Sequence, residues 1–196
     1  MISEIETRRS VRKFTNRAVA REILEQIVAA GLCAPSSKNR QPWKFVVATG
    51  NAKRDALSAM ERGLEREKRE PFLPESARNL ADAEHTLKVM REASAVIFVV
   101  NALGAELSRA LTVDERIYEI CNAQSIGAAV QNMSLAAVEL GLGSLWVCNT
   151  FFAQRELNEW LNTDGELFAA LAVGYAAESP SPRPRKPQSE TVEWKL

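Results

Sequence analysis

The segment 114–140 constrains the fold most, because it reads as one long and mostly apolar helix. It is rich in Ala, Ile, Val and Leu, and it carries few charges after Glu119. The glycines of 141–143 mark its end, as a helix C-cap requires. A helix that is apolar nearly all round is usually buried, either at the centre of a domain or at a subunit contact. Four polar residues interrupt the apolar stretch and argue against a membrane span: Gln131, Asn132, Ser134 and Glu139.

Shorter apolar patterns on both sides of this segment predict a mixture of helices and buried strands. Helical spacing predicts helices at 20–32, 53–69 and 153–162. Continuous or β-branched apolar runs predict strands at 44–49, 93–100, 144–147 and 168–173, and 191–194 is also β-prone. The fold class is therefore α+β or α/β, with long helical excursions between strands. Residues 1–196 show no linker or internal repeat, which predicts a single domain.

The balance of charge and the cysteine pattern exclude several classes of protein. The chain has 25 Lys and Arg against 25 Asp and Glu, so no overall field attracts nucleic acid or an acidic membrane. Its three cysteines form no CxxC pair, which supports neither a zinc site nor a disulfide framework, and it predicts reduced thiols in the cytoplasm. His85 is the only histidine, so a metal site or a Ser-His-Asp arrangement has little support. The charged N-terminus predicts no signal peptide.

A first polar cluster lies near the N-terminus and reads R-R-S-V-R-K-F over residues 8–14. Guanidinium groups bind phosphate bidentately, and a serine hydroxyl adds a donor. Arg8, Arg9, Ser10 and Arg12 are therefore candidates for an anion site. A solvated basic face is the alternative, and a nucleic-acid-binding arm is a weaker one because the rest of the chain is neutral.

A second cluster reads P-S-S-K-N-R-Q-P-W over residues 35–43. It offers many hydrogen-bonding groups and little that packs into a core. Ser36, Ser37, Asn39 and Gln41 have the chemistry to bind a sugar-like polyol or the edge of a heteroaromatic ring. The alternative is a polar helix-to-strand loop closed by an Asx turn.

A third cluster, P-R-P-R-K-P over 182–187, lies in a proline-rich tail. Proline keeps the backbone extended, so Arg183 and Arg185 point to the same side. This arrangement suits a phosphate clamp, and a solvated tail is the alternative.

Taken in order, these clusters resemble the motifs of the FMN-dependent nitroreductase family. The resemblance rests on R-R-S-V-R-K-F, P-S-S-K-N-R-Q-P-W-K-F-V-V, Q-N-M-S-L-A-A-V-E-L-G-L-G-S-L-W and G-Y-A-A-E-S-P-S-P-R-P-R-K-P, which run almost end to end. It implies an α+β sandwich with a central mixed sheet flanked by helices. It also implies a homodimer formed through the long central helix, with FMN at the interface. Residues 50–115 would carry a variable lid, and 177–196 would form a C-terminal arm.

The resemblance also implies a role for each matching residue. The FMN phosphate and ring would be contacted by Arg8, Arg9, Ser10 and Arg12, and the same phosphate by Arg183 and Arg185. The segment that reaches the flavin, in many relatives from the partner subunit, corresponds to Pro35, Ser36, Ser37, Asn39 and Gln41. Cys148 and Asn149 correspond to a backbone segment near the reactive edge of the ring, where relatives often have glycine in place of Asn149. Cys148 is not expected to act as a nucleophile.

The function that this resemblance implies is an FMN-dependent NAD(P)H oxidoreductase. NADH or NADPH would reduce the flavin, and a nitroaromatic, a quinone or a similar acceptor would then reoxidise it in a ping-pong cycle. Hydride chemistry belongs to the cofactor, so no catalytic side chain is expected. No GxGxxG motif is present, which suggests that both substrates share one pocket. The alternatives are enone reduction, dehalogenation or flavin breakdown on the same fold, or a flavin carrier or sensor without catalysis.

Overall fold

The computed structural model describes residues 2–195, and its centre is one sheet of four strands. The strands are β1 (Trp43–Thr49), β2 (Ala95–Asn101), β3 (Gly143–Val147) and β4 (Glu166–Gly174), in the order β1-β2-β4-β3. All three pairs of neighbouring strands are antiparallel. The predicted mixed sheet is therefore antiparallel throughout its named strands. Within residues 2–195, parallel pairing is limited to an isolated bridge between Ser10 and Ser144.

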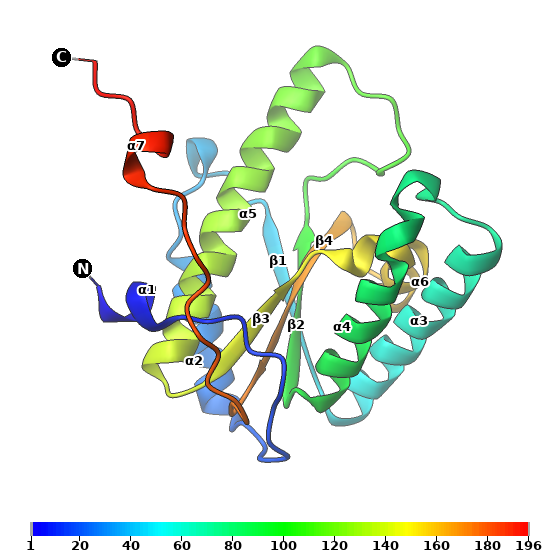
Figure 1. The fold of residues 1–196 in the computed structure, drawn as a ribbon. Coiled ribbons are helices and arrows are strands. Elements are labelled where there is room, and N and C mark those ends of the chain that lie inside the picture. Colours follow the sequence, from blue (N-terminus) through cyan, green and yellow to red (C-terminus); the bar gives the residue numbers. More distant parts are fainter. Residues whose placement is uncertain (1, 196) are drawn as a thin grey trace.

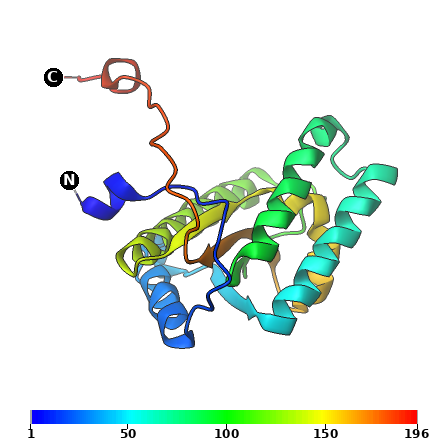
Figure 2. The same ribbon diagram turned by 60° about the horizontal axis from the view of Figure 1, so that its bottom comes forward.

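Helices cover both faces of this sheet and make a three-layer sandwich (Figures 1 and 2). One face carries α2 (Arg21–Leu32) and α5 (Val113–Glu139). The other face carries α3 (Gly50–Arg69), α4 (Leu80–Glu92) and α6 (Gln154–Leu161). The shorter helices are α1 (Ser3–Thr7), η1 (Ser37–Asn39), η2 (Pro74–Asn79), η3 (Asn149–Ala153) and α7 (Gln188–Thr191). The architecture confirms the α+β class.

The central strand β2 explains why two separate cores form. Every residue of β2 is buried, as its continuous apolar sequence predicts for a strand covered on both faces. Successive side chains of a strand point to opposite faces. Phe98 accordingly packs in the core under α3, α4 and α6, whereas Ile97 packs in the core under α2 and α5.

The long helix α5 divides into a buried half and an exposed half. Its N-terminus has a capping box in which Thr112 and Glu115 bond to each other's backbone amides. Its buried residues all lie between Asn122 and Ala137. The first half stands clear of the sandwich (Figure 1) and exposes Val113, Ile117 and Ile120, which are 75%, 51% and 52% exposed. The segment is thus a core helix at one end and a free apolar surface at the other.

The secondary structure differs from the sequence-based prediction in two places. Helix α4 was not predicted, and it fills most of the interval before β2. The β-prone residues 191–194 form no strand, because α7 ends at Thr191 and no strand follows within the described residues. The region 50–115 contains α3, α4 and the predicted strand β2, and its role as a variable lid stays a prediction.

Candidate functional site

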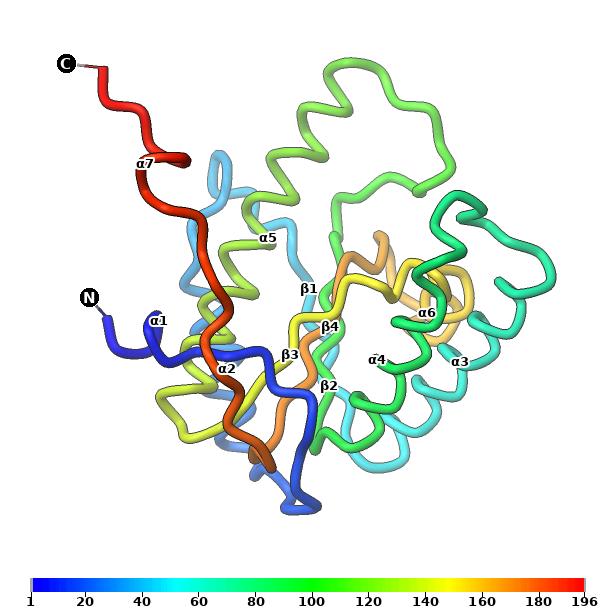
Figure 3. The backbone as a smooth tube through the Cα atoms, viewed as in Figure 1, coloured from blue at the N-terminus to red at the C-terminus, as the bar shows by residue number. Residues whose placement is uncertain are grey.

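The two ends of the chain meet and bring the first and third polar clusters together. Phe14 and Ala176 form an antiparallel bridge. On either side of it, the amide of Ala177 donates to the carbonyl of Lys13 and that of Thr15 donates to the carbonyl of Tyr175, both at 2.9 Å. The tube in Figure 3 shows the N-terminal segment and the C-terminal arm crossing on the outside of the sandwich.

A cavity of about 380 Å³ lies between these segments, and we call it the basic cleft. It is lined by Ile5, Glu6, Arg8, Arg9, Ser10, Arg12, Pro180, Ser181, Pro182, Arg183 and Arg185. Five guanidinium groups and one carboxylate therefore surround one space. All six of the arginine and serine candidates predicted at the two chain ends are brought together here.

The guanidinium groups of the basic cleft differ in whether they already form hydrogen bonds within the protein. Arg9 Nη1 donates to the carbonyls of Glu6 and Arg8 at 2.7 and 2.8 Å, and Arg12 Nη1 donates to the carbonyl of Ser10 at 3.2 Å. Among residues 2–195, no hydrogen bond or ion pair holds the guanidinium groups of Arg8, Arg183 or Arg185. These three groups keep their donors for an anion such as phosphate.

The segment 35–41 has an unusual backbone. Lys38, Asn39 and Gln41 have φ values of 52°, 53° and 47°, in the left-handed region that residues other than glycine rarely occupy. Each such residue costs of order 1–3 kcal/mol, and such strain clusters at functional sites. The loop is held by its own bonds: the amide of Gln41 donates to Ser36 Oγ at 3.0 Å, and its Nε2 donates to Asn39 Oδ1 at 3.2 Å.

This loop does not reach the basic cleft of the same chain. The amide of Ser37 donates to Ser125 Oγ on α5 at 3.3 Å, which anchors the loop beside that helix. None of the predicted residues Pro35, Ser36, Ser37, Asn39 and Gln41 lines the basic cleft. Within one chain, the second polar cluster is therefore separate from the other two.

Cys148 and Asn149 directly follow β3, and the start of this strand is bonded to the segment that carries the first polar cluster. The amide of Val11 donates to the carbonyl of Ser144 at 3.0 Å, near the start of the strand. Cys148 is four residues further on, which is about 13 Å along a strand. Cys148 is exposed, but desolvation by the protein atoms around it raises the pKa of its thiol, so it stays protonated near neutral pH.

The side chain of Asn149 is tied to a residue that the sequence analysis did not single out. Its Nδ2 donates to Thr86 Oγ1 on α4 at 3.0 Å. Its Oδ1 is buried and has no partner among the described residues. The partners are 63 positions apart, so no local pattern in the sequence signals the pair.

The remaining features of the described residues add no second chemistry at this site. His85 is exposed on α4. Residues 2–195 contain no group of three or more His, Cys, Asp or Glu side chains placed to hold a metal ion. No helix within this range has the length and apolar character needed to cross a membrane.

Comparisons with known proteins agree with this arrangement. The sequence profile of the nitroreductase family matches residues 5–175. A protein of Archaeoglobus fulgidus named "Putative NADH dehydrogenase/NAD(P)H nitroreductase" is 31% identical over 175 residues, which cover 87% of this chain and 82% of that protein.

Two solved structures share the fold over nearly the whole chain. A BluB-like flavoprotein of Clostridium difficile 630 is 25% identical, with a TM-score of 0.77, over 99% of this chain and 98% of that one. A Desulfovibrio desulfuricans protein solved in complex with FMN is 26% identical, with a TM-score of 0.72, over 100% of this chain and 96% of that one. The chain belongs to the nitroreductase family.

Proposed function

We propose that this protein is a homodimeric, FMN-dependent NAD(P)H oxidoreductase that reduces nitroaromatic, quinone or similar acceptors. The observation that carries the proposal is the basic cleft, in which Arg8, Arg183 and Arg185 have no partner among the described residues. A phosphate dianion fits this donor set, because guanidinium groups bind phosphate oxygens in pairs. The relative of the same fold that contains FMN supports this choice of anion.

The chain's residues divide the binding of FMN between them. Arg8, Arg183 and Arg185 would hold the phosphate, and Ser10 would add a hydroxyl donor. The backbone after β3, at Cys148 and Asn149, would face the ring. When bound, FMN supplies hydride transfer between a nicotinamide and an acceptor. The protein's part is to orient the cofactor, to supply positive charge and to exclude water.

The position of the 35–41 loop supports a shared site in a dimer. This loop lies beside α5 and away from the basic cleft of its own subunit. Helix α5 also exposes Val113, Ile117 and Ile120 at spacings of four and three, which form one face. Pairing of this face with a second copy would bury the apolar side chains, and it would bring the donors of the loop to the partner's flavin. We propose a ping-pong cycle in which both substrates use the one pocket in turn.

The state of the cysteines indicates the cellular compartment in which we propose that the enzyme works. All three are free thiols. Free thiols persist in a reducing environment, so we place the enzyme in the cytoplasm.

An absorbance spectrum of the purified protein, repeated without air after addition of NADH and then NADPH, tests the proposal. A flavin spectrum that bleaches with either nucleotide is the expected result. If bound flavin stays oxidised with both nucleotides, the protein is a flavin carrier or sensor and not the proposed oxidoreductase. No flavin after incubation with FMN would overturn the cofactor assignment.

A further inference from the structure

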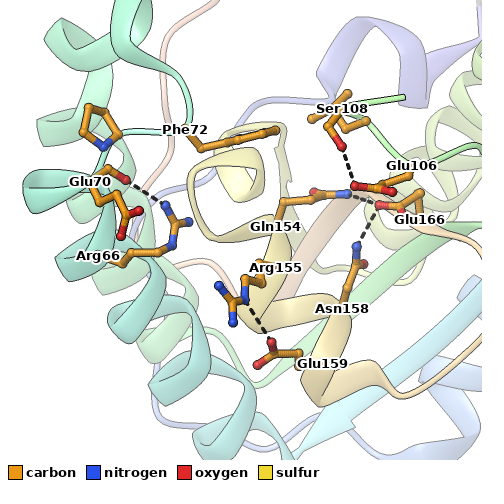
Figure 4. Close-up of a pocket in the computed structure, with 12 residues that line it drawn as sticks. Arg66, Glu70, Phe72, Glu106, Ser108, Gln154, Arg155, Asn158, Glu159 and Glu166 are labelled. Carbon is orange, nitrogen blue, oxygen red and sulfur yellow. Dashed lines mark hydrogen bonds and ion pairs between the residues drawn. The ribbon is translucent and has the colours of Figure 1, made fainter. Parts of the chain in front are cut away.

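A second cavity, of about 530 Å³, lies on the opposite side of the sandwich from α5, and we call it the α3–α6 cavity. Its walls come from the end of α3, from α6, from the loop 106–108 and from the start of β4 (Figure 4). It shares no lining residue with the basic cleft. Its size falls within the range of pockets that hold small molecules.

The rim of this cavity is apolar and exposed. Phe72 follows α3 and is 44% exposed, and Leu107 comes from the loop before α5 and is 49% exposed. Large apolar side chains at such exposure, brought together from segments 35 positions apart, offer a surface for an apolar ligand body.

The floor of the cavity contains a buried acceptor that lacks a donor. Gln154 is 7% exposed, and its Nε2 donates to Glu166 Oε2 and to the carbonyl of Leu167, both at 2.9 Å. Its Oε1 is buried without a partner among residues 2–195. A rotated amide would place this oxygen against two other acceptors, so the orientation is fixed. A buried acceptor left without a donor costs about 1–3 kcal/mol, which a ligand donor would recover once the Gln154 side chain shifts to open its Oε1 to the cavity.

More carboxylates than guanidinium groups line the cavity, and both guanidinium groups are already in ion pairs. Arg66 is already paired, with Glu156 at 2.7 Å and with Glu67 at 2.8 Å. Arg155 is paired with Glu159 at 3.1 Å.

The other three lining carboxylates, those of Glu70, Glu106 and Glu166, are in no ion pair within residues 2–195. Glu106 accepts from Ser108 Oγ, and Glu166 accepts from the Gln154 and Asn158 amides. The carboxylates of this wall can therefore accept further hydrogen bonds and can bind a positive charge.

We infer that the α3–α6 cavity binds a small organic cation, an ammonium or guanidinium group attached to an aromatic or short aliphatic body. The cationic head faces the carboxylates beside Gln154, and the apolar body lies against Phe72 and Leu107. This site is separate from the proposed FMN site, and its occupation does not depend on the flavin.

Calorimetric titration of the full-length protein with benzylamine tests the inference, with benzyl alcohol as the uncharged probe of the same shape. Saturable binding of benzylammonium, at least tenfold tighter than that of benzyl alcohol, is the expected result. The double variant Glu70→Gln/Glu106→Gln, which changes two exposed residues, is expected to weaken benzylammonium binding at least tenfold.

Two controls make the result specific to the cavity. Glu61→Gln/Glu65→Gln removes the same charge from exposed positions of α3 outside the cavity and is expected to leave the affinity within twofold. Arg183→Ala/Arg185→Ala is expected to leave it unchanged as well, because the basic cleft lies elsewhere. The inference is overturned by an absence of saturable binding, by equal affinity for benzyl alcohol, or by binding that Glu70→Gln/Glu106→Gln does not weaken.

Discussion

The carboxylate of Glu67, although it is 3% exposed, accepts a hydrogen bond of 2.7 Å from the backbone amide of Leu73. It also accepts from the amide of Phe72 at 3.0 Å and from Arg66 Nη1 at 2.8 Å. Burial alone would raise the pKa of Glu67, but these bonds outweigh it and lower the pKa. One buried charge thus fixes the chain where it leaves α3 and enters the segment 70–79.

Replacement of this carboxylate is expected to destabilise the protein in a pH-dependent way. Glu67→Gln should lower the free energy of unfolding by about 3 kcal/mol at pH 7, because it breaks a buried, hydrogen-bonded charge pair. Since the folded pKa is lowered, the native contribution is complete above the unfolded pKa and is lost as pH falls through the folded pKa. Urea titrations at pH 7 and at pH values below about 4 should show the gap to wild type closing. An equal gap at both pH values would contradict this account.

The proposed phosphate site depends on the two arginines of the arm. Arg183→Ala/Arg185→Ala is expected to weaken FMN binding at least about 100-fold, since two charge-assisted hydrogen bonds at about 1.5 kcal/mol each are lost. The fold should survive, because both residues are exposed. Flavin absorbance after gel filtration measures the loss. Arg62→Ala/Arg78→Ala removes the same charge at exposed sites outside the cleft and should retain the flavin.

Substitutions in the exposed half of α5 are expected to disrupt the proposed dimer. Ile117→Asp/Ile120→Asp is expected to convert the proposed dimer to a monomer, because it places two charges in a desolvated contact. Both side chains are about half exposed in the single subunit, so helical content should be kept. Light scattering after gel filtration and circular dichroism measure the two properties. A dimer that persists would locate the subunit contact elsewhere.

Replacing Gly63 on α3 with a larger residue is expected to cost packing energy and to gain helix propensity, and the two effects oppose each other. A Cβ at this position would lie 2.6 Å from the Cα of Ala153, closer than real Cβ contacts allow. Gly63→Ala should gain about 1 kcal/mol of helix propensity, and overpacking should cost about 1–3 kcal/mol. We expect net destabilisation in a urea titration. Ser58→Ala, on the exposed side of the same helix, should change the free energy of unfolding by less than about 0.5 kcal/mol.

Cys148 is predicted to react slowly with alkylating agents. Because desolvation raises the pKa of its thiol, the thiolate fraction at any given pH is smaller than that of an ordinary cysteine. The rate of iodoacetamide modification at this residue, followed by mass spectrometry across pH 7 to 10, should still be rising at the upper end. Cys148→Ser should leave the rate of flavin reduction within about twofold, since no nucleophile is removed.

The strands and the long helix were predictable because burial dictates their sequences. The apolar run of 93–100 became β2 (Ala95–Asn101), which neighbours cover on both faces, and segment 114–140 became α5 (Val113–Glu139). The β-prone residues 191–194 had the propensity for a strand, but a strand also needs a partner, and none pairs with them in one subunit.

The site was predictable in its residue types and only partly in its shape. The basic clusters were visible as short runs, but the bridge between Phe14 and Ala176 that joins them depends on the folded topology. The left-handed backbone at Lys38 and Gln41 had no sequence signal, because neither residue type favours it. The α3–α6 cavity draws on four separate segments, none of which has a motif of its own.

The crossing of the two chain ends has a consequence for the order of events during synthesis. Arg8 leaves the ribosome long before Arg183 and Arg185, because about 170 residues separate them in the sequence. The cleft therefore cannot form until residues 180–185 have been synthesised and the arm has crossed the N-terminal segment. Any anion that it binds attaches only after all four strands of the sheet have been synthesised.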